Sequence, residues 1–176
     1  MGKTRNKSLK GRDGSWTLCP APRGNKNSSI YLMFIGEYQH TIDPKKRIAI
    51  PSKFRLHFEG GVVVTRGLDK CLFIYSREEW SKIATKLGEM PVGEKSTRSF
   101  VRLMLAGAVD SNLDSQGRVL IPEYLKEYAN LKKQVIVAGL FNRLELWDEN
   151  EWNKYKKSAE ENQDEIAEQL GKLGMY

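Results

Sequence analysis

The sequence is poor in the residues from which disulfide-stapled, metal-bound and membrane-spanning proteins are built. Among 176 residues it has two cysteines, Cys19 and Cys71, which make neither a disulfide framework nor a zinc site. No run approaches the roughly 18 apolar residues needed to span a bilayer. No basic start followed by an apolar stretch resembles a signal peptide. We therefore expect a reduced protein of the cytoplasm.

Residues suited to catalysis are equally scarce. The two histidines, His40 and His57, share no motif with a nucleophile or with metal ligands. No Gly-rich phosphate loop is present, and the tryptophans at 80, 147 and 152 are more typical of packing than of a stacking platform for bases. A small-molecule enzyme needs a deep pocket with titratable groups, which the sequence does not suggest. We predict no catalytic residue, no metal site and no cofactor, and thus a protein that is not an enzyme.

Positive charge is abundant but gathered at one end of the chain. The net charge is +7, yet residues 1–32 hold seven basic residues and one acidic residue, so the remaining chain carries only +1. A general electrostatic argument for nucleic-acid binding therefore cannot rest on the total charge. The composition of residues 1–32 predicts disorder, and we interpret Met33 as the biological start. The alternative is a basic arm that adds phosphate contacts.

An internal repeat dominates the rest of the sequence. Residues 36–51 can be laid on residues 107–122, where Gly, an apolar residue before Asp, Asp, Arg, Ile and Pro recur at an offset of 71. Later matches recur at offsets of 72 and 73, as small loop changes would produce. We predict a first repeat over 36–80, a second over 107–152, and a charged helical tail over 153–176.

Each repeat is expected to form short strands around a helical turn. The predicted strands are 47–50, 62–65, 71–75, 118–121, 134–138 and 143–147, and the predicted helical turns are 52–58 and 123–130. Amphipathic helices follow Ser76 and Asp148 as N-caps, and a linking helix covers 96–105. One repeat is too small to bury enough surface alone. The predicted fold class is therefore α+β, a pseudo-two-fold β-barrel built from both repeats and flanked by helices.

Each repeat contains one Asp-x-x-x-Arg motif, as Asp43 with Arg47 and as Asp114 with Arg118. In a turn, the carboxylate can accept backbone N–H groups and a charge-assisted bond from the arginine of either repeat. The four residues can therefore lock the two turns together, or the arginines can serve a function. For Arg47 the surrounding charge favours the functional interpretation.

The two motifs differ in their neighbours. Residues 43–55 hold five basic residues and one acidic residue, whereas residues 114–126 hold two of each. Arginine can read guanine with two hydrogen bonds, and lysine suits phosphates; the alternative is a merely solvated cationic loop. The predicted DNA-binding residues are Lys45, Lys46, Arg47, Lys53 and Arg55, and the predicted structural residues are Asp43, Asp114 and Arg118.

Several segments between Met33 and about Tyr155 carry a family resemblance. They are MFIGEY at 33–38, DPKKR at 43–47, TRGLDKCL at 65–72, LAGA at 105–108, DSQGR at 114–118 and FNRLELW at 141–147. In combination they resemble the MraZ family, transcriptional regulators of the division and cell-wall gene cluster. The resemblance implies tandem AbrB-like units in a swapped-hairpin barrel.

The resemblance also implies the partners of the protein. They are further copies of the chain in a ring-shaped homo-oligomer, and double-stranded DNA carrying short G-rich direct repeats in the protein's own promoter. It implies that Arg47 contacts DNA and that the protein is associated with the nucleoid. One departure is that Lys46 stands where the second motif has Gly117. If this position needs positive φ, Lys46 is strained by roughly 1 kcal/mol; otherwise the first turn is reshaped.

A second function stays open beside the regulator. An antidote-type interaction module would bind DNA through the same small barrel and capture a protein partner through an extended tail. Residues 159–176 are the only segment of the sequence suited to such a capture. A stoichiometric heterologous partner would favour this alternative.

Overall fold

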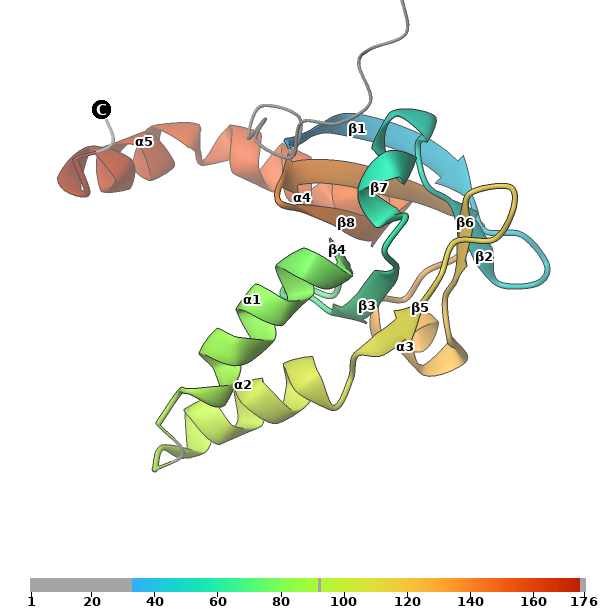
Figure 1. Ribbon diagram of the computed structural model, residues 1–176. Helices are drawn as coiled ribbons and strands as arrows, with labels where there is room; N and C mark the ends of the chain where they lie inside the picture. The colour runs from blue at the N-terminus through green and yellow to red at the C-terminus, as the bar shows by residue number, and fades with distance from the viewer. Residues whose placement is uncertain (1–32, 92, 175–176) are drawn as a thin grey trace, which may run out of the picture. The chain divides into compact units, whose positions relative to one another are not determined.

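The computed structural model describes residues 33–91 and 93–174 (Figure 1), so the leader predicted over 1–32 lies outside the described residues. The first repeat forms β1 (Phe34–Thr41), β2 (Arg47–Ala49), the 3-10 helix η2 (Ser52–Phe58), β3 (Val62–Arg66), β4 (Leu72–Ser76) and α1 (Arg77–Gly88). The second repeat forms β5 (Val109–Ser111), β6 (Arg118–Leu120), α3 (Glu123–Tyr128), β7 (Gln134–Phe141) and β8 (Arg143–Asp148). The helix α2 (Lys95–Leu105) joins them, and α4 (Glu149–Glu161) and α5 (Gln163–Lys172) follow.

Local sequence explains where these elements begin. Ser76 is the N-cap of α1, and its hydroxyl accepts the Glu79 backbone N–H at 3.2 Å. Asp148 caps α4 in the same way, accepting the Asn150 backbone N–H at 3.0 Å. Both predicted caps are confirmed, and they supply partners for amide groups that a helix start leaves unpaired. No helix in the described part of the chain is long and apolar enough to cross a bilayer.

The two repeats exchange strands. The first strand of repeat one, β1, pairs with β7 of repeat two over its whole length, from Phe34 opposite Phe141 to Thr41 opposite Gln134. Reciprocally, β5 of repeat two pairs with β3 of repeat one. The second strands of the repeats, β2 and β6, pair with each other, and all these pairings are antiparallel. Neither repeat therefore completes its own sheet.

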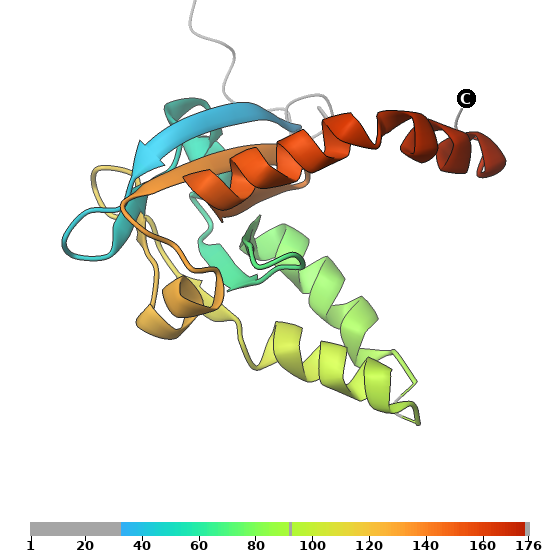
Figure 2. The same cartoon turned by 180° about the vertical axis from the view of Figure 1, so that it is seen from behind.

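The described strands form two separate sheets. One has six strands in the order β1-β7-β8-β4-β3-β5, and the other is the two-stranded ribbon β2-β6. Figure 2 shows α4 lying beside β1 and β7, where Lys156 pairs with Glu37 at 3.0 Å. The α+β class is confirmed. The predicted closed barrel is not confirmed, because hydrogen bonding among the described strands leaves the ribbon apart from an open six-stranded sheet.

The main core lies between these two sheets. Ile48 of β2 and Val119 of β6 are fully buried against apolar side chains from both repeats, among them Val64, Leu72 and Leu146. A second cluster packs α1 and α2 on the sheet, and the tryptophans at 80, 147 and 152 belong to it, as packing residues. The ribbon is thus held to the sheet by burial and not by ladder hydrogen bonds.

The buried underside of the ribbon gives a first prediction. Ile48→Ala removes a fully buried side chain and should lower the free energy of unfolding by about 2–5 kcal/mol. The matched control is Leu120→Ala on the same ribbon, because Leu120 is 50% exposed and its loss should cost under about 0.5 kcal/mol. Urea denaturation of both variants measures this. Equal losses would mean that the ribbon does not close the core.

Candidate nucleic-acid interface

Two equivalent turns precede the strands of the ribbon. In the first, the Asp43 N–H donates to the Arg47 carbonyl and the Lys46 N–H donates to the Asp43 carbonyl, both at 2.9 Å. In the second, Asp114 and Gly117 make the same two bonds at 2.8 Å. Each turn then continues into the ribbon formed by both repeats. The sequence duplication is therefore also a duplication of backbone geometry.

The first turn keeps its shape although it lacks glycine. Lys46 has φ of +60° and Gly117, at the equivalent position, has φ of +75°. The turn is not reshaped, so the lysine occupies the left-handed region, which costs a non-glycine residue roughly 1–2 kcal/mol. Its ammonium pairs with Glu123 of α3 at 2.6 Å. A strained lysine thus stands where repeat two has an unstrained glycine.

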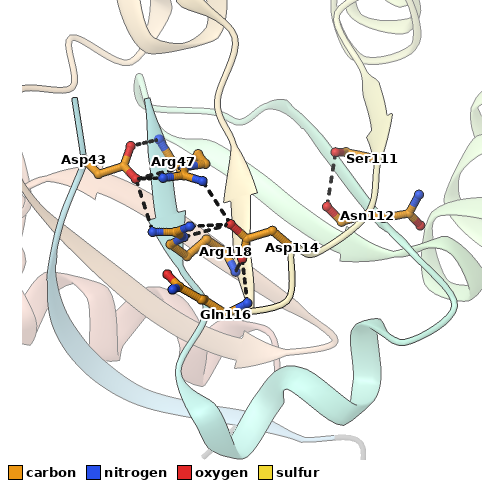
Figure 3. Close-up of polar contacts among 7 residues, drawn as sticks. All are labelled: Asp43, Arg47, Ser111, Asn112, Asp114, Gln116 and Arg118. Atoms are coloured by element: carbon orange, nitrogen blue, oxygen red, sulfur yellow. Dashed lines mark hydrogen bonds and ion pairs between the residues drawn. The ribbon is translucent and has the colours of Figure 1, made fainter. Parts of the chain in front are cut away.

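Four charged side chains join the two turns (Figure 3). The Arg47 guanidinium donates to Asp43 at 2.9 Å and 2.7 Å and reaches Asp114 at 3.2 Å. Arg118 mirrors this pattern, with two contacts of 2.8 Å to Asp114 and one of 3.6 Å to Asp43. Their side chains are similarly exposed, by 24% to 29%. Arg47 therefore has the same structural contacts as Arg118. The sequence predicted a structural role for Asp43, Asp114 and Arg118, but not for Arg47.

The cluster stabilises both carboxylates in their charged form. The Arg118 side chain, followed by the Arg118 backbone N–H, lowers the pKa of Asp114 to about 2. The pKa of Asp43 is also lowered, first by the hydrogen bond from the Arg47 backbone N–H and then by the Arg47 side chain. Both carboxylates are therefore ionised at neutral pH and hold the two guanidinium groups in place.

The arginines lie on the outer face of the ribbon. Because Ile48 and Val119 point into the core, their strand neighbours Arg47 and Arg118 face the opposite side. The carboxylates engage all three nitrogens of Arg47. A guanidinium carries five N–H bonds, two on each terminal nitrogen, so each terminal nitrogen keeps a donor. The ribbon thus presents two oriented guanidinium forks, those of Arg47 and Arg118, with N–H donors left for a ligand.

A basic groove lies beside the first turn. It has a volume of about 380 Å³ and is lined by Ile42, Asp43, Pro44, Lys46, Lys126, Lys132 and Lys133. The lining of the groove therefore includes four lysines and one carboxylate. Three of these lysines belong to repeat two, since strand exchange sets the first turn beside α3 and the loop that leads into β7.

A second groove, of about 330 Å³, occupies the equivalent place beside the second turn. Its lining residues are Arg55, Leu56, Glu59, Asn112, Leu113, Asp114, Ser115 and Gly117. Here one arginine faces two carboxylates. The fold makes the two grooves alike, but only the first has an excess of positive charge.

The structure divides the five predicted DNA-binding residues. Lys45 and Lys46 are exposed at the first turn, next to Arg47. Arg55 instead lies at the second turn, where it donates to the Ile50 carbonyl at 2.8 Å. Lys53 donates to a carbonyl of β1 at 3.0 Å and lies over two aromatic rings of the same region. Counting charge along the sequence grouped residues that strand exchange separates.

Sequence reasoning also missed three residues of the basic groove. Lys126, Lys132 and Lys133 lie some 80 residues from the first turn in the sequence, in a repeat whose own turn region is neutral. The signal that could have found them is the repeat itself. If the repeats exchange strands, the helix and loop of repeat two must be compared with the turn of repeat one.

Comparison with known proteins gives a consistent family. The model of the family described as "MraZ protein, putative antitoxin-like" matches residues 33–103 and again residues 104–172. Transcriptional regulator MraZ of Halothermothrix orenii is 49% identical over 143 residues, which are 81% of this chain and all of that protein. Transcriptional regulator MraZ of Acetivibrio thermocellus is 46% identical over 143 residues, with the same coverage. These relatives are named as regulators and not as enzymes.

The lowered pKa of Asp114 gives a second prediction. A folded-state pKa of about 2, below the unfolded value of about 3.9, adds stability that is complete above the unfolded pKa and is lost as the pH falls toward 2. Asp114→Asn cannot gain or lose this contribution. The difference in melting temperature between the wild-type protein and this variant should therefore be largest near neutral pH. It should shrink between about pH 4 and pH 2.

Melting curves at matched ionic strength measure this difference. Asp164→Asn, an exposed substitution in α5, is the control and should melt like the wild-type protein throughout. A gap for Asp114→Asn that stays constant down to pH 2 would show that the ion cluster does not stabilise the fold.

Proposed function

This chain belongs to the MraZ family, and we propose that it is a sequence-specific transcriptional regulator that binds double-stranded DNA. The observation that carries the proposal is the β2-β6 ribbon, whose outer face holds two arginines clamped by carboxylates. The major groove of DNA admits a two-stranded ribbon, and arginine is the side chain best suited to guanine. Because both forks are already oriented, binding loses little side-chain entropy.

Within this proposal the residues take different roles. Arg47 reads a base edge, and Lys45 and Lys46 contact phosphates on either side of it. Asp43, Asp114 and Arg118 hold the ribbon and its forks in place. The predicted DNA contacts of Lys53 and Arg55 stay predictions, and the surroundings of Arg55, beside two carboxylates, favour placing it away from the phosphates.

We further propose a ring-shaped homo-oligomer that binds short direct repeats in the promoter of the protein's own operon, within the division and cell-wall gene cluster. One ribbon spans few base pairs, and outside residues 1–32 each chain carries a net charge of only +1. One copy should therefore hold DNA weakly, and several linked copies on successive repeats would bind firmly. Such a regulator would work in the cytoplasm, at the nucleoid.

The proposal includes the swapped-hairpin barrel of AbrB-like units. The exchange of β1 and β5 between repeats supports it, as does the shared core beneath the ribbon. The tandem boundaries 36–80 and 107–152 remain our prediction for the two units.

An antidote-type interaction module is the second candidate. The observation that favours it is the tail, where Ala159, Gln163, Ile166, Ala167 and Leu170 line an apolar groove of about 360 Å³. A protein bound there would form a one-to-one complex that dissociates when α5 is deleted. If the purified chain forms only oligomers of itself and deletion of α5 leaves them intact, the regulator alone is supported.

The two arginines give a third prediction. Arg47→Ala and Arg118→Ala should lower the melting temperature by similar amounts, since both side chains have the same carboxylate contacts. Only Arg47→Ala should remove sequence discrimination, at about 1–3 kcal/mol per contact, or roughly 5- to 150-fold. Binding isotherms on promoter DNA and on scrambled DNA measure the effect. Greater loss of discrimination in Arg118→Ala would place the reading arginine at the other turn.

The valency of binding gives a fourth prediction. A duplex with two correctly spaced repeats should bind about 10²–10⁴-fold more tightly than a duplex with one repeat. The control duplex keeps both repeats but moves one by half a helical turn, about five base pairs. Equal affinities for all three duplexes would contradict binding by linked copies.

A further inference from the structure

We propose that the basic groove beside the first turn binds the phosphodiester backbone of duplex DNA. The ligands to the phosphates are Lys46 of repeat one and Lys126, Lys132 and Lys133 of repeat two. This inference rests on the proposed function, and it adds three residues of the second repeat to the interface. It also sets the direction in which one protomer lies on the duplex.

The groove is held by backbone hydrogen bonds, so its lysines start from fixed positions. The Ile42 N–H donates to the Lys133 carbonyl at 2.9 Å and joins the first turn to the loop before β7. The Leu131 N–H closes that loop on the Lys126 carbonyl at 2.9 Å. Asp148 accepts the Lys132 backbone N–H at 3.1 Å. The two walls of the groove therefore come from different repeats but are bonded to each other.

The lysine side chains are available for a ligand. Lys132 and Lys133 are exposed, and within residues 33–91 and 93–174 neither ammonium has an ion-pair partner. Glu123 is shared by the other two lysines, at 2.6 Å from Lys46 and 3.8 Å from Lys126. One carboxylate cannot neutralise two ammonium groups, and Asp43 is already bonded to the arginines. The groove therefore keeps an excess of positive charge.

Comparison with the groove beside the second turn indicates that the positive charge of the basic groove serves a function beyond solubility. Lys126 and Arg55 hold equivalent positions at the repeat offset of 71, as do Gly117 and Lys46. Yet Arg55 faces Glu59 and Asp114. The basic groove at one end of the ribbon therefore has an excess of positive charge, and the equivalent groove at the other end has none. A unit with near two-fold geometry would otherwise bind DNA in either direction, whereas direct repeats require one direction in every protomer.

Phosphate is the ligand that this chemistry fits best. Lysines act as point charges toward phosphates, and DNA carries phosphates along both edges of the groove that a ribbon enters. The basic groove adjoins the outer face of the ribbon at the first turn, where Lys46 leads directly into Arg47. A DNA strand seated there would flank the base edge that Arg47 reads.

The test compares two triple variants of the full-length chain. Lys126, Lys132 and Lys133 are changed together to Gln, and the control changes Lys82, Lys86 and Lys95 of α1 and α2 to Gln. Both variants lose three positive charges, but the control lysines lie on helices that leave the ribbon untouched (Figure 1). Melting curves verify that each variant folds. If the triple variant does not fold, the double variant Lys132→Gln with Lys133→Gln replaces it in the binding measurements.

Affinities are measured on the protein's own upstream DNA and on a scrambled duplex of the same length, from about 50 mM to about 200 mM salt. The groove variant should bind both duplexes more weakly, by roughly tenfold or more at about 100 mM salt. The slope of log affinity against log salt should fall by about 2–3. The control variant should keep the wild-type slope.

Three results would overturn the inference. The first is a groove variant whose slope equals that of the control, and the second is a loss confined to the upstream duplex, which would make the lysines base readers. Binding of an acidic protein in the groove, lost in the triple variant while the DNA slope is unchanged, overturns it as well. The same measurements test the proposed function separately. The proposed function fails if the wild-type protein binds the upstream duplex and the scrambled duplex equally well. A shallower salt slope in the groove variant would still support phosphate binding in the groove.

Discussion

The exchange of strands between the two repeats is the constraint on which the rest of the structure depends. A repeat with four short strands cannot cover its own apolar surface. By pairing β1 with β7 and β5 with β3, the repeats build one core between a six-stranded sheet and a two-stranded ribbon. The ribbon then brings the two turns together, although 71 residues separate them in the sequence. The reciprocal bonds of four charged residues are possible only in this arrangement.

The duplication repeats the backbone geometry of the turns, and the divergence of side chains between the repeats makes the two ends of the ribbon different. The turn, its arginine and the groove beside it each occur twice, once for each repeat, with matching hydrogen bonds in the two turns. The side chains around them differ, so that one groove is lined by four lysines and one carboxylate and the other by one arginine and two carboxylates. Lys46 illustrates the divergence, because it occupies a backbone position at φ of +60° that glycine would occupy without strain. Its charge in the basic groove is the compensation that we propose.

Much of the fold could be predicted from the sequence because local signals and the repeat agreed. The caps Ser76 and Asp148 and the helical turn at 52–58 formed where expected. The predicted barrel is not confirmed, since the register and closure of sheets depend on contacts distant in sequence, which local patterns do not determine. The site was predictable in part: the four motif residues meet, but Arg55 joins the opposite turn. Lysines 126, 132 and 133 escaped notice because charge was counted along the chain and not across exchanged strands.

The central claim is that the outer face of the ribbon and its first turn meet DNA. Hydrogen–deuterium exchange of the full-length chain, with and without its upstream duplex, tests this directly because it reports backbone protection segment by segment. The account predicts slower exchange in residues 43–50, 115–121 and 126–133 when DNA is bound, and no change in α1 and α2. Protection confined to α1 and α2, or to the tail helices α4 and α5, with the ribbon unaffected, would contradict it.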